Sequence, residues 1–483
     1  MCSIMLVLIN TNTMRPPIAP IGIDYVAGAV RKAGCEVDVV DLCLSNEPEM
    51  TLRQYFATHD PKLVGLSLRN VDDCFWPSAA WFIPDLMKTI ASIRNMTYAP
   101  IVLGGVGYSI FAEEIVRCTD VEFGIRGDGE WSMAALLKQL LGSRRYETVP
   151  GLVWRIGGQV TASGGAWPEK LQLPTERDAV DNLTYFNKGG QCGLETKRGC
   201  NRQCIYCADP LAKGCAPRVR EPAEVADEVE SLLKQGVDVL HLCDSEFNIP
   251  YGHAIAVCEE FIRRGLGDKV QWYTYMAVTP FDSGLAEAMK KAGCAGIDFT
   301  GDSANDSVLK SYGHPHGKDD LELAVKLCKD NDIKVMIDLL LGGPGETPDS
   351  VKETIEFMKK IDPDCAGPAL GVRIYPNTHI VRLLEETEGD LNENPNIRRK
   401  YTGRIDLLKP TFYISPHLGP RPAELVHQCI ASDKRFFEPL SEFAPEVVEA
   451  GSDYNYNDNA DLEQAIKNGA RGAYWHILSK LRS

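Results

Sequence analysis

The sequence predicts an α/β protein with two successive domains built on parallel strands and a mostly helical C-terminal region. Residues 1–140 and 191–385 each alternate short apolar runs with segments of helical spacing, the pattern typical of parallel sheets. The units in the second stretch have the length of the β/α units in a full or partial barrel. Hydrophobic residues make up 44% of the 483-residue chain, which is enough for ordinary cores.

The first domain is expected to be a doubly wound, Rossmann-like sheet over 1–140. Apolar or β-branched runs predict strands, and periodic segments predict helices between them. The strands are expected at 5–10, 36–42, 63–69 and 101–105, and the helices at 21–34 and around 77–94. Ligands of such sheets bind at the carboxyl ends of the strands, which here are followed by the loops 10–20, 69–74 and 104–109.

Residues 141–190 are interpreted as a linker with a hairpin at 151–162, which turns at Gly157 and Gly158. From 191 to 385 each helical segment leads into a further apolar strand, so we expect a partial (β/α) barrel. The strands are expected at 237–244, 270–276, 295–301, 333–343 and 366–376. Residues 386–483 are expected to form a C-terminal helical domain.

Composition excludes several classes of partner. The formal net charge is 51 − 67 = −16, so the chain would repel the phosphates of a nucleic acid. No run of about 18 apolar residues predicts a membrane span. The N-terminus lacks the basic flank and cleavage site of a signal peptide. The 16 cysteines therefore fit free thiols in a reducing cytoplasm, and most are expected to be small buried residues.

One group of cysteines departs from that pattern. Cys200, Cys204 and Cys207 have the spacing CxxxCxxC within KRGCNRQCIYCADP (197–210). Soft thiolates favour an iron–sulfur cluster or zinc. A structural zinc site would need a fourth ligand, which Cys192 or Cys215 could supply. We favour a four-iron cluster in which three cysteines leave one iron open to a ligand.

At these residues the sequence resembles the radical S-adenosylmethionine (SAM) superfamily. The resemblance implies a [4Fe-4S] cluster on the three cysteines, with SAM chelating the open iron. LCDSEFN (242–248), GIDFTGDS (296–303) and LLLGGPGET (339–347) are similar to the family's SAM-binding segments, and GVRIYPNT (371–378) to the last strand of cobalamin-dependent members. The glycines are also compatible with a strand-to-helix turn alone. The implied cofactor-binding residues are Tyr206, Asp244, Ser245, Glu246, Asp298, Gly342, Gly343 and Arg373.

A doubly wound domain ahead of such a barrel resembles a cobalamin-binding domain, although flavodoxin-like and nicotinamide-binding domains share its glycine-rich loop. GLSLRN (65–70) and IRGDGE (125–130) are similar to segments of the cobalamin-dependent branch. Glycines after the strand at 101–105 would let the backbone approach a large flat ligand. The expected contacts are Ser67, Arg69, Asn70, Gly104, Gly105, Gly107, Ser109, Gly127 and Glu130.

The chain lacks the DxHxxG motif whose histidine ligates cobalt in other cobalamin domains, and the nearest histidine is His59. We therefore expect no histidine ligand to cobalt. Arg69 resembles the arginine that lies below cobalt in tryptophan-methylating relatives, where a cation would disfavour a sixth ligand. The alternative is that Arg69 pairs with Asp72 or Asp73.

The combined resemblance implies a C-methyltransferase that moves a methyl group from SAM, via methylcobalamin, to a carbon of a small molecule or peptide. An external low-potential electron donor and anaerobic conditions are implied. LLKPTFYISPHLG (407–419) and NGARGAYWHIL (468–478) are similar to methylases that modify glutamine in a methanogenesis enzyme. The alternatives are polar methylation or cyclisation of a small metabolite, and a non-catalytic cobalamin or redox sensor.

Acid–base residues are the least determined part of the site. Tyr375 is the expected catalytic residue besides the three cysteines and Arg69. The cofactors and the substrate are expected to share one cavity between the two domains, and Tyr312, His314 and His316 are further candidates to face it. Glu346 and Asp244 lie in motifs of the family and are therefore also acid–base candidates. The alternative is that they only bind SAM.

Overall fold

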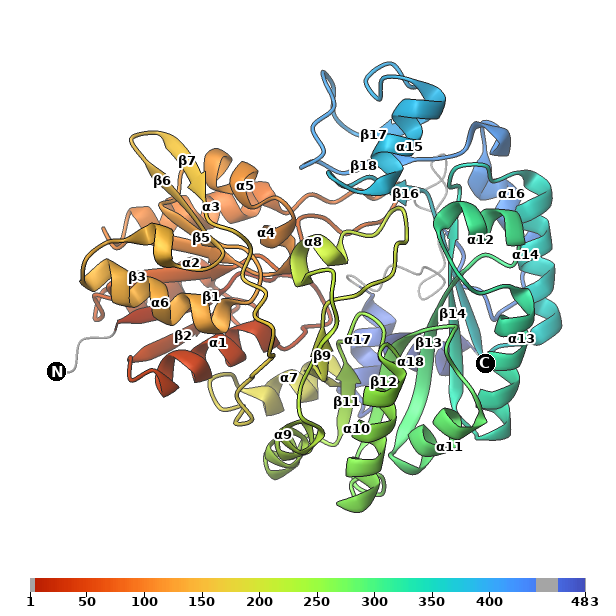
Figure 1. Ribbon diagram of the computed structural model, residues 1–483, viewed down its shortest axis with the longest axis horizontal. Helices are drawn as coiled ribbons and strands as arrows, with labels where there is room; N and C mark the ends of the chain where they lie inside the picture. The colour runs from red at the N-terminus through yellow and green to blue at the C-terminus, as the bar shows by residue number, and fades with distance from the viewer. Residues whose placement is uncertain (1–4, 440–458, 483) are drawn as a thin grey trace.

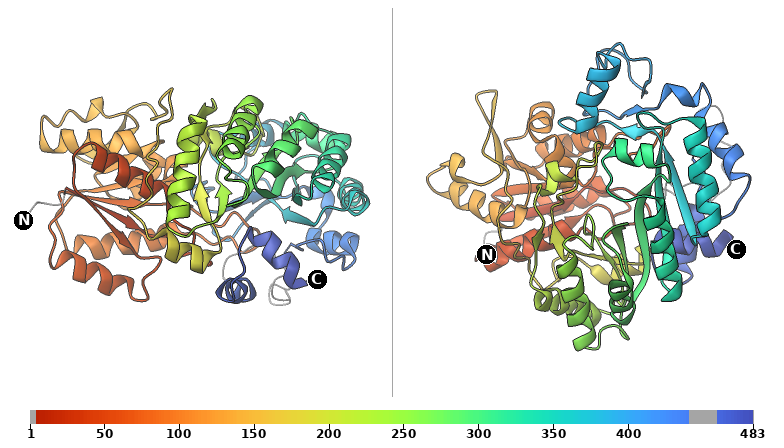
Figure 2. Two further views of the ribbon diagram at one scale, coloured as in Figure 1. Left: turned by 90° about the horizontal axis from the view of Figure 1, so that it is seen from below. Right: turned by 45° about the vertical axis from the view of Figure 1, so that its right-hand side comes forward.

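The structure is a computed structural model that describes residues 5–439 and 459–482. It contains two α/β domains side by side, with the small antiparallel sheet of the C-terminal region at one end of their junction (Figure 1). The views in Figure 2 show the two sheets in separate parts of the molecule, the first in red to orange and most of the second in green to cyan. The part of the expected C-terminal helical domain at 440–458 lies outside the described residues.

The N-terminal sheet has seven strands in the order β2-β1-β3-β4-β5-β6-β7. The strands are β1 (Leu6–Asn10), β2 (Val37–Asp41), β3 (Leu63–Ser67), β4 (Ile101–Gly104), β5 (Phe123–Ile125), β6 (Leu152–Ile156) and β7 (Gln159–Ala162). The first five are parallel, which confirms the doubly wound fold. The hairpin β6–β7 pairs antiparallel with β5, so the sheet continues beyond residue 140 into the segment interpreted as a linker.

Helices cover both faces of this sheet because each strand alternates apolar residues between two cores. On one face α1 (Ile21–Lys32) packs against α6 (Gly129–Leu141) over Leu6 and Leu8. The other face covers Val7 and Ile9. The helices on that face are α2 (Pro48–Phe56), α3 (Ile83–Arg94), α4 (Val106–Ile110) and α5 (Ala112–Thr119).

The second domain is a six-stranded, all-parallel sheet in the order β15-β14-β13-β12-β11-β8. The strands are β8 (Cys192–Leu194), β11 (Val239–Leu242), β12 (Gln271–Ala277), β13 (Cys294–Asp302), β14 (Lys334–Leu341) and β15 (Cys365–Leu370). The connecting helices are α9 (Pro222–Lys234), α10 (Tyr251–Arg263), α11 (Ser283–Lys291), α12 (Asp306–Tyr312), α13 (Lys318–Asp330) and α14 (Pro348–Ile361). Strands β8 and β15 do not pair with each other, so the expected barrel is partial.

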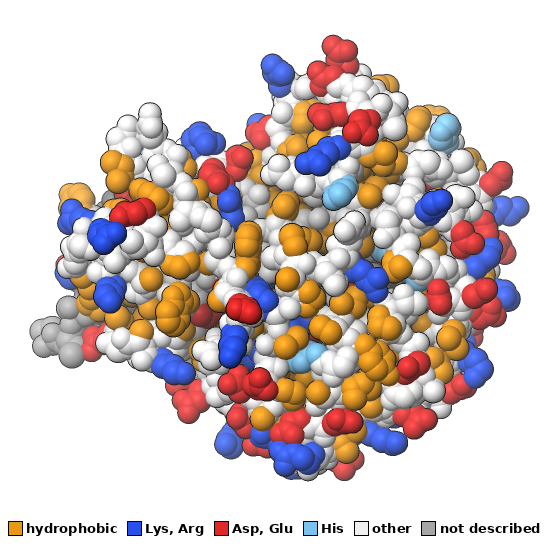
Figure 3. Space-filling model, viewed as in Figure 1, with side chains coloured by type: hydrophobic (Ala, Val, Ile, Leu, Met, Phe, Trp, Pro, Cys, Tyr) orange, Lys and Arg blue, Asp and Glu red, His pale blue; other side chains and the backbone are white. Residues whose placement is uncertain are grey.

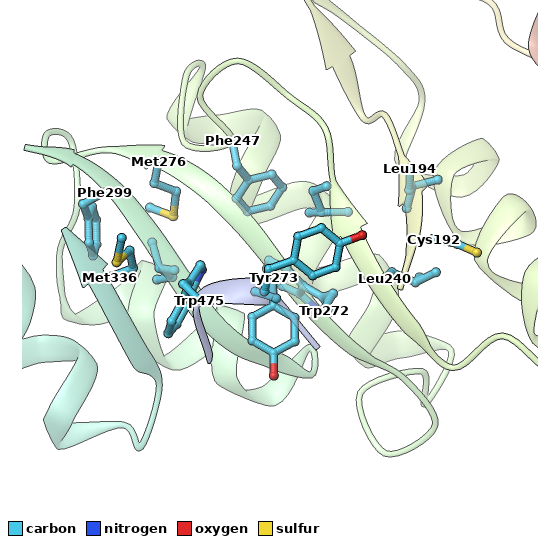
Figure 4. Packing of buried hydrophobic residues seen from close by; sticks show 14 of the residues in the cluster. Cys192, Leu194, Leu240, Phe247, Trp272, Tyr273, Met276, Phe299, Met336 and Trp475 are labelled. Carbon is cyan, nitrogen blue, oxygen red and sulfur yellow. The ribbon is translucent and has the colours of Figure 1, made fainter. Parts of the chain in front are cut away.

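The C-terminal region closes the lower end of this barrel. Trp475, on α18 (Tyr474–Arg482), packs its ring 6.1 Å from that of Tyr273 on β12 (Figure 4). A side chain at Gly296 would lie 3.0 Å from Trp475, so glycine there permits the packing. The region also contains α15 (His379–Glu388), α16 (Pro422–Ile430), α17 (Ala460–Lys467) and the sheet of β16 (Val372–Arg373), β17 (Ile397–Arg399) and β18 (Thr411–Tyr413).

A buried set of ion pairs joins the two domains. Arg177 has no exposed surface and binds Asp24 of α1 at 2.6 Å and Glu228 of α9 at 2.8 Å. Arg198, on β9 (Lys197–Arg198), binds Glu130 of α6 at 2.8 Å. Arg177 is paired with carboxylates of both domains, and Arg198 with a carboxylate of the facing domain. Separating the domains would therefore leave unpaired buried charges. These pairs hold the two domains in a fixed relative position.

None of the described helices combines the length and apolarity needed to cross a membrane. Figure 3 shows acidic and basic side chains interspersed over one face of the molecule, without a continuous basic tract on that face.

Candidate functional site

A cavity of about 400 Å³ lies between the two domains, at the carboxyl ends of both sets of parallel strands. The N-terminal domain contributes the loop after β3, beginning with Arg69 and Asn70, and the first residues of α4. The second domain contributes the cysteine loop and side chains at the ends of its central strands. Both sheets thus direct their ligand-binding ends to one space, as expected for open parallel sheets.

The three thiols predicted to hold a cluster line this cavity together. Cys200, Cys204 and Cys207 lie on the loop between β9 and α8 (Asp209–Lys213). Gly199 begins the loop at φ +84°, and a Cβ there would lie 2.3 Å from the Ala216 oxygen, so the turn requires glycine. Burial raises the pKa of Cys204 to about 12, so its thiolate needs the positive charge of bound iron.

The zinc alternative is not supported. Cys192 lies on β8 and donates to the Asn182 oxygen at 3.4 Å, and Cys215 is exposed. Throughout 5–439 and 459–482, no three His, Cys, Asp or Glu side chains converge closely enough to hold a single metal ion. A four-iron cluster distributes its ligands around a cube, so three soft thiols on the wall of one cavity fit it.

The residues after β11 have different environments. Asp244 accepts hydrogen bonds from the Thr196 backbone at 2.8 Å and from the Lys197 backbone at 3.2 Å, so it anchors the strand before the cysteine loop. Ser245 lines the cavity and donates to Asp209. Glu246 also lines it, and one carboxylate oxygen accepts from Thr300 at 3.0 Å.

The second oxygen of Glu246 is buried and has no hydrogen-bond partner among the described residues. Burial raises the pKa of Glu246 to about 7. A cationic group entering the cavity would stabilise the ionised carboxylate, and the protonated amine of SAM has that chemistry.

Tyr206 lines the cavity between two of the cysteines and donates to Asp302, which also contacts His314 at 2.6 Å. His314 lines the cavity as expected. His316 is buried against the Gly301 oxygen at 3.2 Å and is absent from the cavity lining. Tyr312 donates to the Leu340 oxygen at 3.0 Å, so its hydroxyl is used within the fold.

The predicted glycine turn after β14 supports the barrel loop. Gly342 has φ +92°, and its backbone nitrogen donates to Glu346 at 2.7 Å. A Cβ on Gly343 would lie 2.1 Å from the Tyr312 hydroxyl. Neither glycine lines the cavity, so the turn-forming role is the one that the geometry supports, and their SAM contacts stay a prediction.

In the N-terminal wall, Arg69 is exposed to the cavity. Its guanidinium contacts Met14 Sδ at 3.7 Å and forms no ion pair within the described parts of the chain. The alternative pairings are not formed, because Asp72 binds Arg373 at 2.8 Å and Asp73 accepts from Ser78 and nearby backbone. Arg69 is therefore a cation that is available to a ligand.

The other predicted cobalamin contacts divide into two groups. Asn70 and Gly107 line the cavity, and a Cβ on Gly104 would meet nothing within 4 Å, so the end of β4 is open to a large ligand. Asn12, in the loop after β1, has a buried amide nitrogen without a partner in the described chain. Open backbone and spare amide donors fit the flat ring and amide side chains of cobalamin.

The second group is engaged within the protein. Ser109 donates to the Gly105 oxygen at 2.9 Å and accepts from the Gly127 backbone at 3.0 Å. Glu130 binds Arg198 in the domain joint. Ser67 accepts through its backbone from Thr11 at 2.8 Å. Their roles as cofactor contacts stay predictions.

Tyr375 lines the cavity, and its hydroxyl lies 2.8 Å from the Cys74 sulfur. Arg373 is buried in the pair with Asp72 and lies 4.6 Å above the Tyr375 ring, so it orients this side of the cavity. The lining residues that sequence reasoning missed include Cys74, Tyr275, Thr300 and Asp338. The signal for the last three was the alternation along their strands, which places every second side chain inside the barrel.

Comparisons with known proteins agree with both halves of this site. The model of the B12 binding domain matches residues 7–137, and that of the radical SAM superfamily matches residues 194–358. Tryptophan 2-C-methyltransferase of Streptomyces laurentii is 29% identical to the chain, over 92% of the chain and 84% of that protein.

Solved structures give the same result. The radical SAM methyltransferase TsrM from Kitasatospora setae, with tryptophan and a SAM analogue bound, has a TM-score of 0.91 at 28% identity, covering 99% of this chain and 98% of that one. The same enzyme with cobalamin and a [4Fe-4S] cluster bound has a TM-score of 0.89 at 27% identity, with 99% and 97% covered. The chain therefore belongs to the cobalamin-binding radical SAM enzymes, and it is a methyltransferase that uses a [4Fe-4S] cluster, SAM and cobalamin.

Proposed function

We propose that this enzyme methylates a carbon atom of a small aromatic amino acid, with tryptophan as the first candidate. The observation that carries the proposal is that a single cavity is lined by Arg69 of one domain and by all three cluster cysteines of the other. Support for the acceptor comes from TsrM, which binds tryptophan and has almost the same length and fold.

The residues of this chain have distinct tasks in that reaction. The three cysteines hold the cluster, and Glu246 offers a free carboxylate oxygen beside it for the amine of SAM. The loops after β3 and β4 receive cobalamin. When bound, the cofactors supply the methyl group and the redox chemistry. That Arg69 lies below cobalt stays a prediction, and the arginine could not ligate the metal because a guanidinium keeps its proton.

A glutamine residue in a protein is the weaker candidate acceptor. The segments that suggested it, 407–419 and 468–478, build the fold in this structure. Phe412 and Tyr413 are buried in β18, and Trp475 and Leu478 are buried in α18. These segments therefore have a structural role in this chain, and their similarity to glutamine methylases does not by itself support a glutamine acceptor.

The test is an anaerobic reaction of the reconstituted enzyme with SAM, cobalamin, tryptophan and titanium(III) citrate as the low-potential electron donor. We expect S-adenosylhomocysteine and a product heavier than tryptophan by one methylene. S-adenosylhomocysteine without methylated tryptophan would exclude this acceptor. Formation of 5′-deoxyadenosine in step with the product would indicate a substrate radical, whereas its absence would favour polar methylation.

A further inference from the structure

We propose that Lys197, just before the cysteine loop, supplies a buried positive charge that balances the anionic iron–sulfur cluster and makes the cluster easier to reduce. Lys197 does not line the cavity, so it is a positioning residue that acts through the cluster. The inference concerns the cluster alone and does not depend on which molecule accepts the methyl group.

The fold places the amine of Lys197 beside the first cluster ligand. Lys197 lies on β9, in the strand that leads to Cys200, and is 1% exposed. Its Nζ donates to the Gly199 oxygen at 3.4 Å, and that carbonyl belongs to the peptide bond between Gly199 and Cys200. Burial raises the pKa of the Cys200 thiol, and the charge of Lys197 is among those that act in the opposite direction. The amine is therefore within electrostatic reach of the thiolates that would hold iron.

The polypeptide provides no counter-charge for this amine. An ammonium has three N–H donors, and the hydrogen bond to Gly199 uses one of them. Within 5–439 and 459–482, no carboxylate forms an ion pair with Lys197. Asp244 lies close by, but it accepts hydrogen bonds from the backbone nitrogens of Thr196 and Lys197. The charged end of Lys197 thus has only a neutral carbonyl as its partner in the described chain.

Other buried basic side chains nearby show what such a charge normally requires. Arg198, the next residue, binds Glu130 at 2.8 Å. Arg220 is 1% exposed and binds Glu228 at 2.6 Å. A buried charge is costly without an opposite charge beside it. The partner of Lys197 is therefore expected to be an anion that the site receives with its cofactors.

The cluster is the anion that fits this position. Three thiolates outweigh the positive charge of the iron–sulfur core, and reduction adds a further negative charge. A fixed cation in a poorly hydrated surrounding stabilises the reduced cluster more than the oxidised one, which raises the reduction potential.

Two other anions fit less well. Neither oxygen of Glu246 pairs with Lys197, because one accepts from Thr300 at 3.0 Å and the other has no partner among the described residues. The carboxylate of SAM would enter through the cavity, and Lys197 is absent from the cavity lining. The cluster needs no such contact, because charges interact across several ångströms in a protein interior.

The test is the midpoint potential of the cluster in the holoenzyme, measured by EPR during titration with titanium(III) citrate. Lys197→Met keeps most of the apolar stem and removes the charge. At a given solution potential we expect the ratio of reduced to oxidised cluster to fall at least about tenfold, which corresponds to a shift of about 59 mV to lower potential. Lys310→Met, at an exposed lysine of α12, is the matched control. It should leave the potential unchanged, because water and salt screen an exposed charge.

A second measurement separates this role from a structural one. In the cluster-free protein Lys197 is a buried amine with one hydrogen bond, so Lys197→Met should leave the melting temperature unchanged or raise it. Loading the cluster should then raise the melting temperature less in the variant than in wild type, because the charge that favours the cluster is gone.

Three results would overturn the inference. An unchanged midpoint potential in Lys197→Met would show that its charge does not act on the cluster. A lower melting temperature of the cluster-free variant, or its failure to fold, would show that Lys197 supports the loop. An unchanged potential combined with weaker SAM binding would assign Lys197 to the carboxylate of SAM. None of these results bears on the proposed acceptor, which product analysis tests separately.

Discussion

The two walls of the cavity are built by different means. In the N-terminal wall, loops are set by close contact between backbones, as at Gly105, where a Cβ would lie 2.5 Å from the Leu68 oxygen. Its charged side chain available to ligands is the cation Arg69. In the barrel wall, side chains project from strands, and the ligand-facing groups are thiols and carboxylic acids such as Glu246. Substitutions that add volume should therefore disturb the N-terminal wall most. Substitutions that remove a charge or a ligand atom should disturb the barrel wall most.

The largest effect is expected for Cys204→Ala in the barrel wall. Loss of one of three ligands should abolish assembly of the cluster, because among the described residues the only other cysteine that lines the cavity is Cys74 on the opposite wall. We expect the visible absorbance of the iron–sulfur cluster and the methyl transfer to disappear, while cobalamin binding is retained.

The exposed Cys215 lies outside the cavity, so Cys215→Ala is the matched control and should keep both cluster and activity. A Cys204→Ala protein with an intact cluster would refute the assignment. Loss of cobalamin together with the cluster would show that the two walls do not bind their cofactors independently.

The next effect concerns the joint between the walls. Arg177→Met should lower the free energy of unfolding by about 3–5 kcal/mol, because it leaves Asp24 buried without its cation and removes one of the two arginines that pair with Glu228. Arg31→Met breaks an ion pair whose side chains are 42% and 67% exposed, and should cost at most about 1 kcal/mol. Denaturant unfolding of both variants measures the difference, and equal losses would contradict a buried joint.

Much of the fold could be predicted from the sequence because apolar periodicity is local. The runs at 63–69 and 101–105 are strands β3 and β4 within a residue or two. The hairpin at 151–162 was also visible, but its pairing with β5 was not, because edge-to-edge pairing depends on residues far apart in the chain. The small sheet at 372–413 was missed because its strands are far apart in the chain and because each is only two or three residues long.

The site was predictable where one segment carries several functional groups, as at the cysteines. It was not predictable where function depends on which face a strand presents. Asp338 sits in an apolar run, KVMIDLLL, that reads as a buried strand, and only its register with Thr300 places it in the cavity. Conversely, Glu130 lies in a segment similar to ligand-binding loops, yet its carboxylate binds Arg198. Whether a side chain binds a ligand or a residue of the other domain depends on the folded structure, so the sequence around it does not predict which partner it has.

A smaller effect is expected on the pH dependence of stability, through a buried carboxyl group of the second domain. Burial raises the pKa of Glu346 from its usual value near 4.5 to about 7, so folding favours the protonated acid. The stabilisation is present below the unfolded pKa, declines as pH rises between about 4.5 and 7, and is lost above 7. The loss from this group is at most about 3 kcal/mol. Glu346→Gln, which keeps an acceptor for Gly342, should flatten that decline in melting experiments at pH 5 to 8. An unchanged pH dependence would exclude Glu346 as its cause.

The smallest effects test the volume sensitivity of the N-terminal wall. Alanine normally stabilises a helix relative to glycine, by about 0.5–1 kcal/mol in its interior. At Gly107 of α4 a Cβ would lie 2.9 Å from the backbone of Asn70, so the loop after β3 must move. We expect Gly107→Ala to destabilise by about 1–3 kcal/mol and to weaken cobalamin binding without loss of the cluster. At Gly22 of α1 a Cβ meets nothing within 4 Å, so Gly22→Ala should stabilise by about 0.5 kcal/mol or less. Thermal melts and cobalamin titrations of the two variants separate the cases. If Gly107→Ala behaves like Gly22→Ala, close backbone contact does not shape this wall, and the contrast with the barrel wall is then one of charge alone.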